Sequence, residues 1–267
     1  MNFFSVFILV VGGLIGLAWY AGDTPQFFER TILKIDTLFS DEKESEHSYA
    51  VKSDIKLSIS NINGPITILG HNKNELKVLV TKKGNAKDFD NIATKIEKNE
   101  DFISFKTIYN KHYNQDAVVV TYQVFAPYNS YLKLIENING SINIGNINSD
   151  MIIKNVNGSI TIDNSQSSVY AETINGKITL TVTKLNQDKK ITLSSVNGSL
   201  ESFLPQNLSA DIIAETLVGT ISSDFNLGTY QKKFTGKQAQ GSIGSKKGGS
   251  INLKITRGKI DIHKKNL

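Results

Sequence analysis

The chain has 267 residues, which is long enough for one or two domains with a substantial core. Hydrophobic residues make up 39% and charged residues 21%, which excludes both a disordered polyelectrolyte and a polytopic membrane protein. Cysteine is absent, so disulfide scaffolds, thiolate metal sites and cysteine nucleophiles are excluded, while the formal net charge of +5 is compatible with acidic partners without requiring one.

The N-terminal segment predicts where the protein resides. Residues 3–20 carry no charge and would span about 27 Å as a helix, close to the thickness of a bilayer core. Trp19 and Tyr20 favour an uncleaved membrane anchor, and a signal peptide cleaved near Gly16-Leu17-Ala18 is the alternative. Either option exports the rest of the chain. We therefore expect an anchor or signal peptide at 1–22 and a polar tether at 23–49.

An Asn-Gly motif between apolar runs recurs along the remainder of the chain. From Gly140 to Gly219 the motif glycines are 18, 18, 22 and 21 residues apart, and a period near 20 is typical of one solenoid coil. The last two copies replace Asn by Val218 and Arg257. The motif residues are Asn63, Gly64, Asn139, Gly140, Asn157, Gly158, Asn175, Gly176, Asn197, Gly198, Gly219 and Gly258.

A two-residue hairpin is the obvious interpretation of Asn-Gly, but the phase of the side chains contradicts it. The residue before Asn is aliphatic and the residue after Gly is polar or proline, and a hairpin would pair the two on one face. Residues four before the Asn position and two after Gly are apolar in six copies. The motif therefore predicts a corner between two strands, with Asn residues in a ladder on coils about 4.8 Å apart.

The predicted fold class is all-β, a parallel β-solenoid of the β-helix or β-roll type with coils of about 20 residues. It covers residues 50–265, less regular at 50–135 and regular at 136–265, and an antiparallel sandwich or meander is the alternative. Phe89, Ile92 and Ile96 have helical spacing and predict one short helix at 86–98 in the N-terminal cap. The basic ending at 260–267 is expected to protect the other open edge of the stack.

The sequence resembles the DUF4097 family of bacterial adhesin-like repeat proteins over most of residues 50–264. The resemblance depends on INGPITILG (62–70), the repeated Asn-Gly-Ser-Ile motifs and the ending GSIGSKKGGSINLKITRGKIDI (241–262). It implies an extracytoplasmic β-solenoid, often attached to a membrane, with no established enzymatic activity and no catalytic residues to transfer. Val218 and Arg257 depart from the family pattern.

The sequence contains no pattern typical of a catalytic or metal site. There is no serine nucleophile elbow and no phosphate-binding loop, and the nearest approach to the latter is the Gly-rich basic segment 236–249. Lysines alternate with acidic residues, which does not favour nucleic acid. We therefore expect no enzymatic activity, cofactor, metal or nucleic-acid partner. The four histidines are far apart and have no metal-site spacing: His47, His71, His112 and His263.

Two sets of side chains could still carry function. Glu136, Lys154, Glu172 and Glu215 share the position three before the Asn position, which predicts an outward charge ladder. Paired carboxylates in a groove would instead indicate a polysaccharide-active β-helix enzyme. The aromatic residues within 109–131 are expected to pack the cap, and a carbohydrate-stacking surface is the alternative.

These observations predict a non-catalytic, envelope-associated protein with an adhesin-like or scaffolding role. We expect it outside the cytoplasm, attached to the membrane through its N-terminal helix, with a glycan, the cell wall or another protein as ligand. An envelope-stress regulatory module that binds a membrane protein is a further option. The sequence leaves these options and the oligomeric state open.

Overall fold

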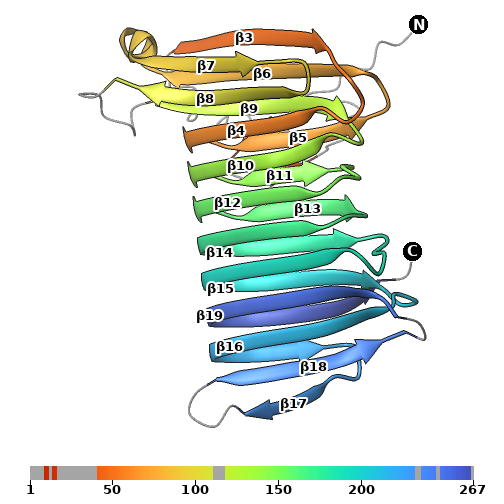
Figure 1. Cartoon of the computed structure of the whole chain (residues 1–267). Helices are drawn as coiled ribbons and strands as arrows, with labels where there is room; N and C mark the ends of the chain where they lie inside the picture. Colours follow the sequence, from red (N-terminus) through yellow and green to blue (C-terminus); the bar gives the residue numbers. More distant parts are fainter. Residues whose placement is uncertain are drawn as a thin grey trace, which may run out of the picture.

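The computed structural model describes residues 9–11, 14–16, 41–110, 118–231, 236–244 and 247–265. Most of these residues are β-strand and only η1 is helical, which confirms the predicted all-β class. Seventeen strands form one curled sheet, and Figure 1 shows it as a tall stack in which each turn of chain lies on the next.

The centre of the stack consists of strands that pair in parallel with the equivalent strands of neighbouring turns. Asn139 aligns with Asn157, which aligns with Asn175, which in turn aligns with Asn197. The Asn-Gly positions thus lie at the bend within one turn, along the left-hand edge in Figure 1. These strands are β10 (Tyr131–Asn139), β11 (Ile142–Gly145), β12 (Met151–Asn157), β13 (Ile160–Ser165), β14 (Val169–Val182) and β15 (Lys190–Pro205).

Glycine is needed at the bend because successive turns approach each other too closely for a side chain. A Cβ atom on Gly158 would lie 2.1 Å from the Gly140 carbonyl oxygen, and the φ angle of Gly158 is +146°. Gly176 has no such positive φ, yet its Cβ would lie 2.0 Å from the Gly158 oxygen. Positive φ angles between 120° and 157° occur at Gly64, Gly140, Gly158, Gly198, Gly219 and Gly258.

An aliphatic column fills the inside of the stack. Each turn contributes two apolar residues to this column, one four positions before the Asn position and one two positions after Gly. These side chains are almost fully buried, except for Ile221, which is partly buried. Burying one such side chain contributes about 1.5–3 kcal/mol, so the repeat supplies a continuous core. The two rows include Ile59, Ile135, Ile153, Ala171 and Leu193 on one wall and Ile66, Ile142, Ile160, Ile178 and Leu200 on the other.

The N-terminal end combines parallel and antiparallel pairing. β4 and β5 continue the parallel stack, β3, β6 and β9 pair antiparallel, and β7 and β8 form a hairpin. These elements are β3 (Asp41–Ala50), β4 (Lys56–Asn63), β5 (Ile66–His71), β6 (Glu75–Gly84), the 3₁₀ helix η1 (Ala86–Asn91), β7 (Ile92–Lys98), β8 (Phe102–Tyr109) and β9 (Val118–Pro127).

The helix predicted at 86–98 is wrong over most of its length. Only η1 is helical, with the Asn85 side chain accepting a hydrogen bond from the Lys87 backbone at its start. From Ile92 onward the chain is strand β7, paired antiparallel with β8. The spacing of Phe89, Ile92 and Ile96 fits a helix, but the second and third of these also fit a strand, and pairing with β8 decides between them.

The polar segment predicted as part of a tether is a strand where the structure describes it. Residues 41–50 form β3, which pairs with β6 over its whole length. The acidic residues of β3 face a lysine-rich strand: Lys77 lies 2.9 Å from Glu46, and Lys83 lies 2.9 Å from Glu42. Charge complementarity along the strand pair therefore accounts for an ordered segment in place of a linker. Residues 23–40 lie outside the described residues.

The predicted membrane segment is described only at β1 (Leu9–Val11) and β2 (Leu14–Gly16), which pair antiparallel. These residues are therefore extended where a helix was expected, and the β-branched Val10, Val11 and Ile15 favour that backbone. The remainder of 1–22 lies outside the described residues. Across the described part of the chain, none of the helices has the length and hydrophobicity to cross a bilayer.

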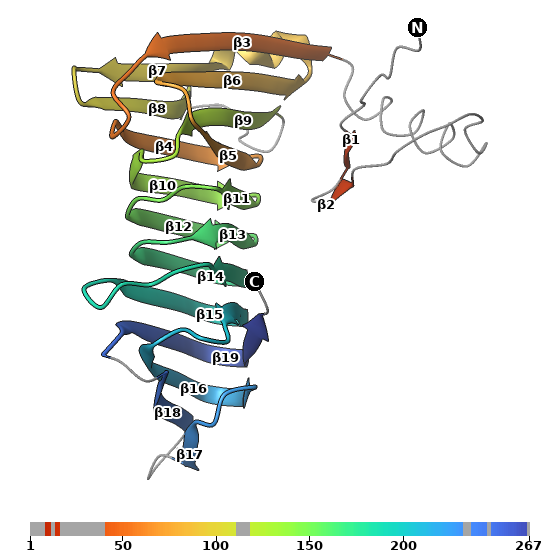
Figure 2. The ribbon, with the colours of Figure 1, turned by 90° about the vertical axis from the view of Figure 1, so that its right-hand side faces the viewer.

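The C-terminal strand is not at the end of the stack, contrary to the predicted edge protection by residues 260–267. β19 (Gly249–Lys265) lies between β15 and β16 (Ala210–Ser223) and is parallel to both. Its apolar residues Ile251, Leu253 and Ile260 are buried in the central column, which explains its interior place. The end of the stack is formed instead by β18 (Lys237–Ile243) and β17 (Gly228–Gln231), which pair antiparallel (Figure 2).

The crowding at the bend gives a stability prediction. We expect Gly158→Ala to lower the free energy of unfolding by about 2 kcal/mol or more, because the new Cβ would meet the Gly140 carbonyl at an unfavourable φ. Gly228→Ala is the control, since its Cβ would lie 3.6 Å from the nearest atom. Urea unfolding of both variants checks the prediction, and equal losses would contradict it.

Candidate binding surface

The bend edge carries an outer ladder of asparagine side chains. The Asn157 amide donates to Asn139 over 3.0 Å, Asn175 donates to Asn157 over 2.9 Å, and Asn197 donates to Asn175 over 3.0 Å. At the top of the stack Asn63 donates to the Val118 carbonyl over 3.2 Å. The ladder ends where Arg257 and Val218 replace Asn, because β19 and β16 follow β15 in space.

A second, inner ladder satisfies the carbonyl groups of the bend glycines. Asn137 donates to the Gly64 oxygen over 2.9 Å, and Asn155 donates to the Gly140 oxygen over 2.8 Å. The equivalent residues of later turns continue this pattern with hydroxyl groups, Thr173 to Gly158 and Ser195 to Gly176. These buried polar residues thus stabilise the bend and are not available to a ligand.

A row of exposed aliphatic side chains runs beside the outer Asn ladder. The row occupies the position just before Asn, or before Val218 in β16, and its members are 42–49% exposed in four turns. The hydrophobic core does not use these side chains, so their exposure on four turns has no internal explanation. The equivalent Val156 of β12 is half-buried, and β19, which lies between β15 and β16, has Thr256 at this position. The sequence pattern shows that this position is aliphatic. It does not predict whether the side chains face the core or the solvent. The row comprises Ile138, Ile174, Val196 and Leu217.

The outward wall before the bend carries the expected charge ladder. Glu136 aligns with Lys154, which aligns with Glu172, and Lys154 Nζ lies 2.7 Å from the Glu172 carboxylate. Glu215 lies beside Lys254 because β19 is inserted next to β16. Acidic and basic side chains are therefore neighbours on adjacent strands of this wall, which stabilises the pairing of those strands.

The Glu172 carboxylate is held in its charged form. Partial burial raises the pKa of Glu172, but hydrogen bonds from Lys154 and from the Tyr170 hydroxyl, at 2.6 Å, outweigh burial and lower the pKa below its ordinary value. The same pairing raises the pKa of Lys154. This carboxylate is therefore a structural partner and is poorly suited to donate a proton near neutral pH.

The wall after the bend brings two carboxylates side by side. Glu201 on β15 aligns with Asp261 on β19. Each is paired with a lysine, Glu201 with Lys177 at 2.5 Å and Asp261 with Lys259 at 3.0 Å. His263 lies 3.7 Å from the same Glu201. The pair is thus compensated by neighbouring cations, and Asp261 is itself largely buried.

The structure keeps the described histidines apart. His47 packs against Phe105 with ring centroids 5.9 Å apart, the His71 ring accepts a hydrogen bond from the Lys73 backbone, and His263 stacks on Phe203. His112 lies outside the described residues. Among the described side chains, no three metal-ligating groups converge.

The aromatic segment 109–131 divides between core and surface. Tyr122 is fully buried, where its hydroxyl meets Thr107 at 2.8 Å, and burial raises the pKa of this tyrosine. Tyr128 is instead 39% exposed. Tyr113 lies outside the described residues, as does part of the Gly-rich segment 236–249.

Comparison with solved structures finds this fold in bacterial proteins. A putative cell adhesion protein from Clostridium sporogenes ATCC 15579 has a TM-score of 0.50 at 15% identity, covering 84% of this chain and 100% of that chain. A putative adhesin from Bacteroides fragilis NCTC 9343 has a TM-score of 0.30 at 12% identity, covering 84% and 97%. The first likeness shows a shared fold, and the second is too distant to support an argument.

The comparisons with family models and with curated proteins gave no match. No family model therefore confirms the expected resemblance to the DUF4097 family, and what is shown is a fold shared with one structure described as a putative cell adhesion protein.

The two polar ladders differ in burial, and this difference can be measured. We expect Asn155→Ala to destabilise the protein by about 1–3 kcal/mol, because the buried Gly140 carbonyl and Val156 amide both lose their partner. The control Asn157→Ala removes an exposed amide and should cost less than about 1 kcal/mol. Thermal unfolding distinguishes the two, and a larger loss for Asn157→Ala would contradict the assignment.

The ion pair of Glu172 predicts a pH dependence. A carboxyl group with a lowered folded-state pKa contributes stability above its unfolded pKa, and that contribution disappears as the pH falls through the folded pKa. Glu172→Gln should therefore reduce the free energy of unfolding by less than about 1 kcal/mol at pH 7, since the pair is partly exposed. The difference from wild type should begin to shrink near the ordinary glutamate pKa of about 4.3 and should vanish once the pH is below the lowered folded-state pKa of Glu172. A difference that persists in acid, measured by urea unfolding at pH 3 and 7, would contradict this.

Proposed function

We propose that the protein is a non-catalytic, adhesin-like binding protein that acts outside the cytoplasm. In this proposal the stacked turns form a parallel β-solenoid, and residues 1–22 direct its export or anchor it to the membrane. The observation that carries the proposal is the row of exposed aliphatic side chains beside the Asn ladder.

The repetition of this row supports a binding role. From β10 to β15, turns about 4.8 Å apart repeat an aliphatic side chain followed by an Asn amide. Leu217 lies beyond the inserted β19 and is followed by Val218. A surface of this kind offers apolar contact flanked by hydrogen-bonding groups, which is the usual composition of a protein docking site. The description of the Clostridium sporogenes structure as a putative cell adhesion protein is compatible with such a role.

The state of the carboxylates supports a non-catalytic function over the polysaccharide-active alternative. A glycosidase needs an acid and a base about 5–9.5 Å apart that are free to exchange protons with substrate. Glu172 and Glu201 are instead bound to Lys154 and Lys177. Their side chains lie on outward walls, where ion pairs between turns are sufficient to explain their presence.

The proposal predicts that the aliphatic row is needed for binding and not for folding. The variant Ile138→Ser/Ile174→Ser/Val196→Ser/Leu217→Ser should keep wild-type thermal stability within a few degrees, because these side chains are outside the core. It should lose about tenfold or more in co-sedimentation of the full-length chain with purified bacterial envelopes.

The matched control replaces aliphatic side chains of similar exposure elsewhere. Ile108 is 40% exposed and Ile213 is 39% exposed, and neither belongs to the row. The variant Ile108→Ser/Ile213→Ser should co-sediment like wild type. Equal losses in both variants, or no sedimentation of the wild-type protein, would overturn the proposal.

A further inference from the structure

A shallow polar hollow of about 370 Å³ lies where the chain leaves β11 and β13. These strands end at the right-hand edge of the stack in Figure 1, the edge that faces the viewer in Figure 2. The hollow crosses several turns, and its lining residues are Tyr128, Asn146, Asn148, Asn164, Gln166 and Thr183.

The backbone fixes this lining in place. Asn146 and Asn164 adopt left-handed φ angles of 58° and 60°, and the Asn164 side chain donates to the Asn146 side chain over 2.9 Å. The backbone N–H of Asn148 donates to the Tyr128 carbonyl over 2.7 Å, which ties one turn to the next. The polar groups are therefore presented from a rigid stack, which lowers the entropic cost of binding.

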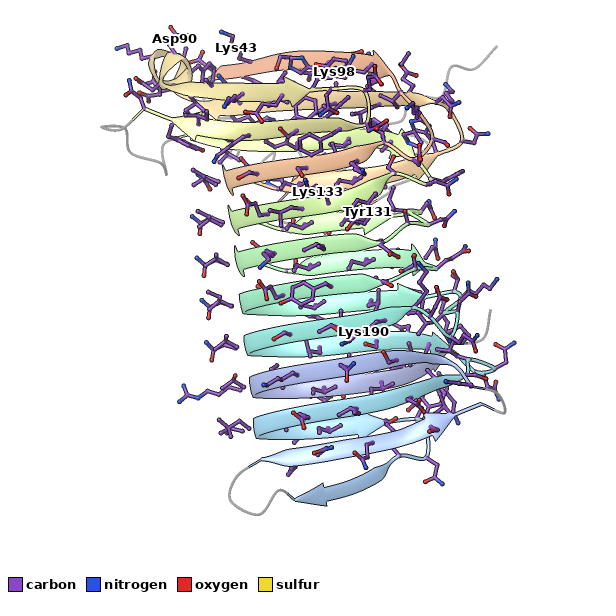
Figure 3. The ribbon with its side chains drawn as sticks, in the orientation of Figure 1. Lys43, Asp90, Lys98, Tyr131, Lys133 and Lys190 are labelled. Atoms are coloured by element: carbon purple, nitrogen blue, oxygen red, sulfur yellow. The ribbon has the colours of Figure 1, made fainter. Side chains whose placement is uncertain are left out.

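Several of these groups have hydrogen-bonding capacity left. Within the described residues, the Asn148 and Gln166 side-chain amides and the Tyr128 hydroxyl have no hydrogen-bond partner. Each amide offers two donors and an acceptor carbonyl. The Tyr128 ring, 39% exposed, adds one flat apolar face. Figure 3 shows that Lys98, Lys133 and Lys190, by contrast, belong to other parts of the stack, and none of them lines the hollow.

We propose that this hollow binds an uncharged glycan. Its lining contains amides, hydroxyls and one aromatic ring, and it contains no Asp, Glu, Lys, Arg or His. A ligand that matches it has many hydroxyl groups, no net charge and one apolar face that can lie on a ring, which is the chemistry of a neutral sugar. A protein partner would need more apolar contact than one tyrosine supplies.

The arrangement across turns favours a polymer over a single sugar. Asn146 and Asn164 lie at equivalent places near the ends of β11 and β13, on successive turns about 4.8 Å apart. Consecutive sugar units along the stack would therefore meet similar amide groups. This inference rests on the proposed binding function and assigns it a ligand class and a second surface, away from the aliphatic row.

Isothermal titration calorimetry of the full-length chain tests the proposal with hexasaccharides of glucose, galactose, mannose and N-acetylglucosamine. At least one should bind saturably, and Tyr128→Ala and Gln166→Ala should each weaken it by about tenfold, since stacking and hydrogen bonding each contribute on that scale. Tyr128→Phe should retain most of the affinity. Tyr170→Ala is the matched control, because Tyr170 is 38% exposed on another wall.

Three results would overturn the proposal: no saturable binding of any probe up to about 5 mM, binding that Tyr128→Ala leaves unchanged, or tighter binding of a sulfated hexasaccharide. The quadruple serine variant of the aliphatic row should keep hexasaccharide binding. Loss of envelope binding in that variant with sugar binding intact would separate the two surfaces, so failure of one proposal is distinguishable from failure of the other.

Discussion

The close approach of backbones at the bend is the constraint on which the rest of the structure depends. Successive turns meet so closely there that a Cβ atom on Gly158 would lie 2.1 Å from a neighbouring carbonyl oxygen. Glycine solves the steric problem but leaves its carbonyl group facing the interior. The buried Asn137 and Asn155 side chains supply the missing hydrogen bonds. Sterics and hydrogen bonding together thus explain why a small polar residue stands two positions before each Asn.

The C-terminal strand changes what the repeat would otherwise build. In a sequential stack each turn contacts only its neighbours in sequence, and stability is then close to a sum of local terms. Here β19 is inserted between β15 and β16, so the C-terminal strand pairs with strands that lie earlier in the sequence. The insertion also places Lys254 beside Glu215 and leaves β17 and β18 to cover the end of the stack.

The molecule separates structural side chains from those available to a partner. Alternating ion pairs such as Lys154 with Glu172 use the charged groups of one wall internally. The aliphatic row at the bend and the amide-lined hollow around Tyr128 are not used in this way. They lie on different edges of the same rigid stack, so one protein could contact a partner surface with the first and a sugar polymer with the second.

The sequence by itself determined the all-β class, the bend at Asn-Gly and the charge ladder, because each depends on the local alternation of side chains within one turn. It did not determine that residues 41–50 form a strand, that residues 92–98 are not helical, or that β19 lies inside the stack. Those outcomes depend on partners distant in sequence: β6 for β3, β8 for β7, and β15 and β16 for β19. The hollow was equally inaccessible to sequence reasoning. Tyr128 and Gln166 are 38 positions apart and meet only because the turns stack.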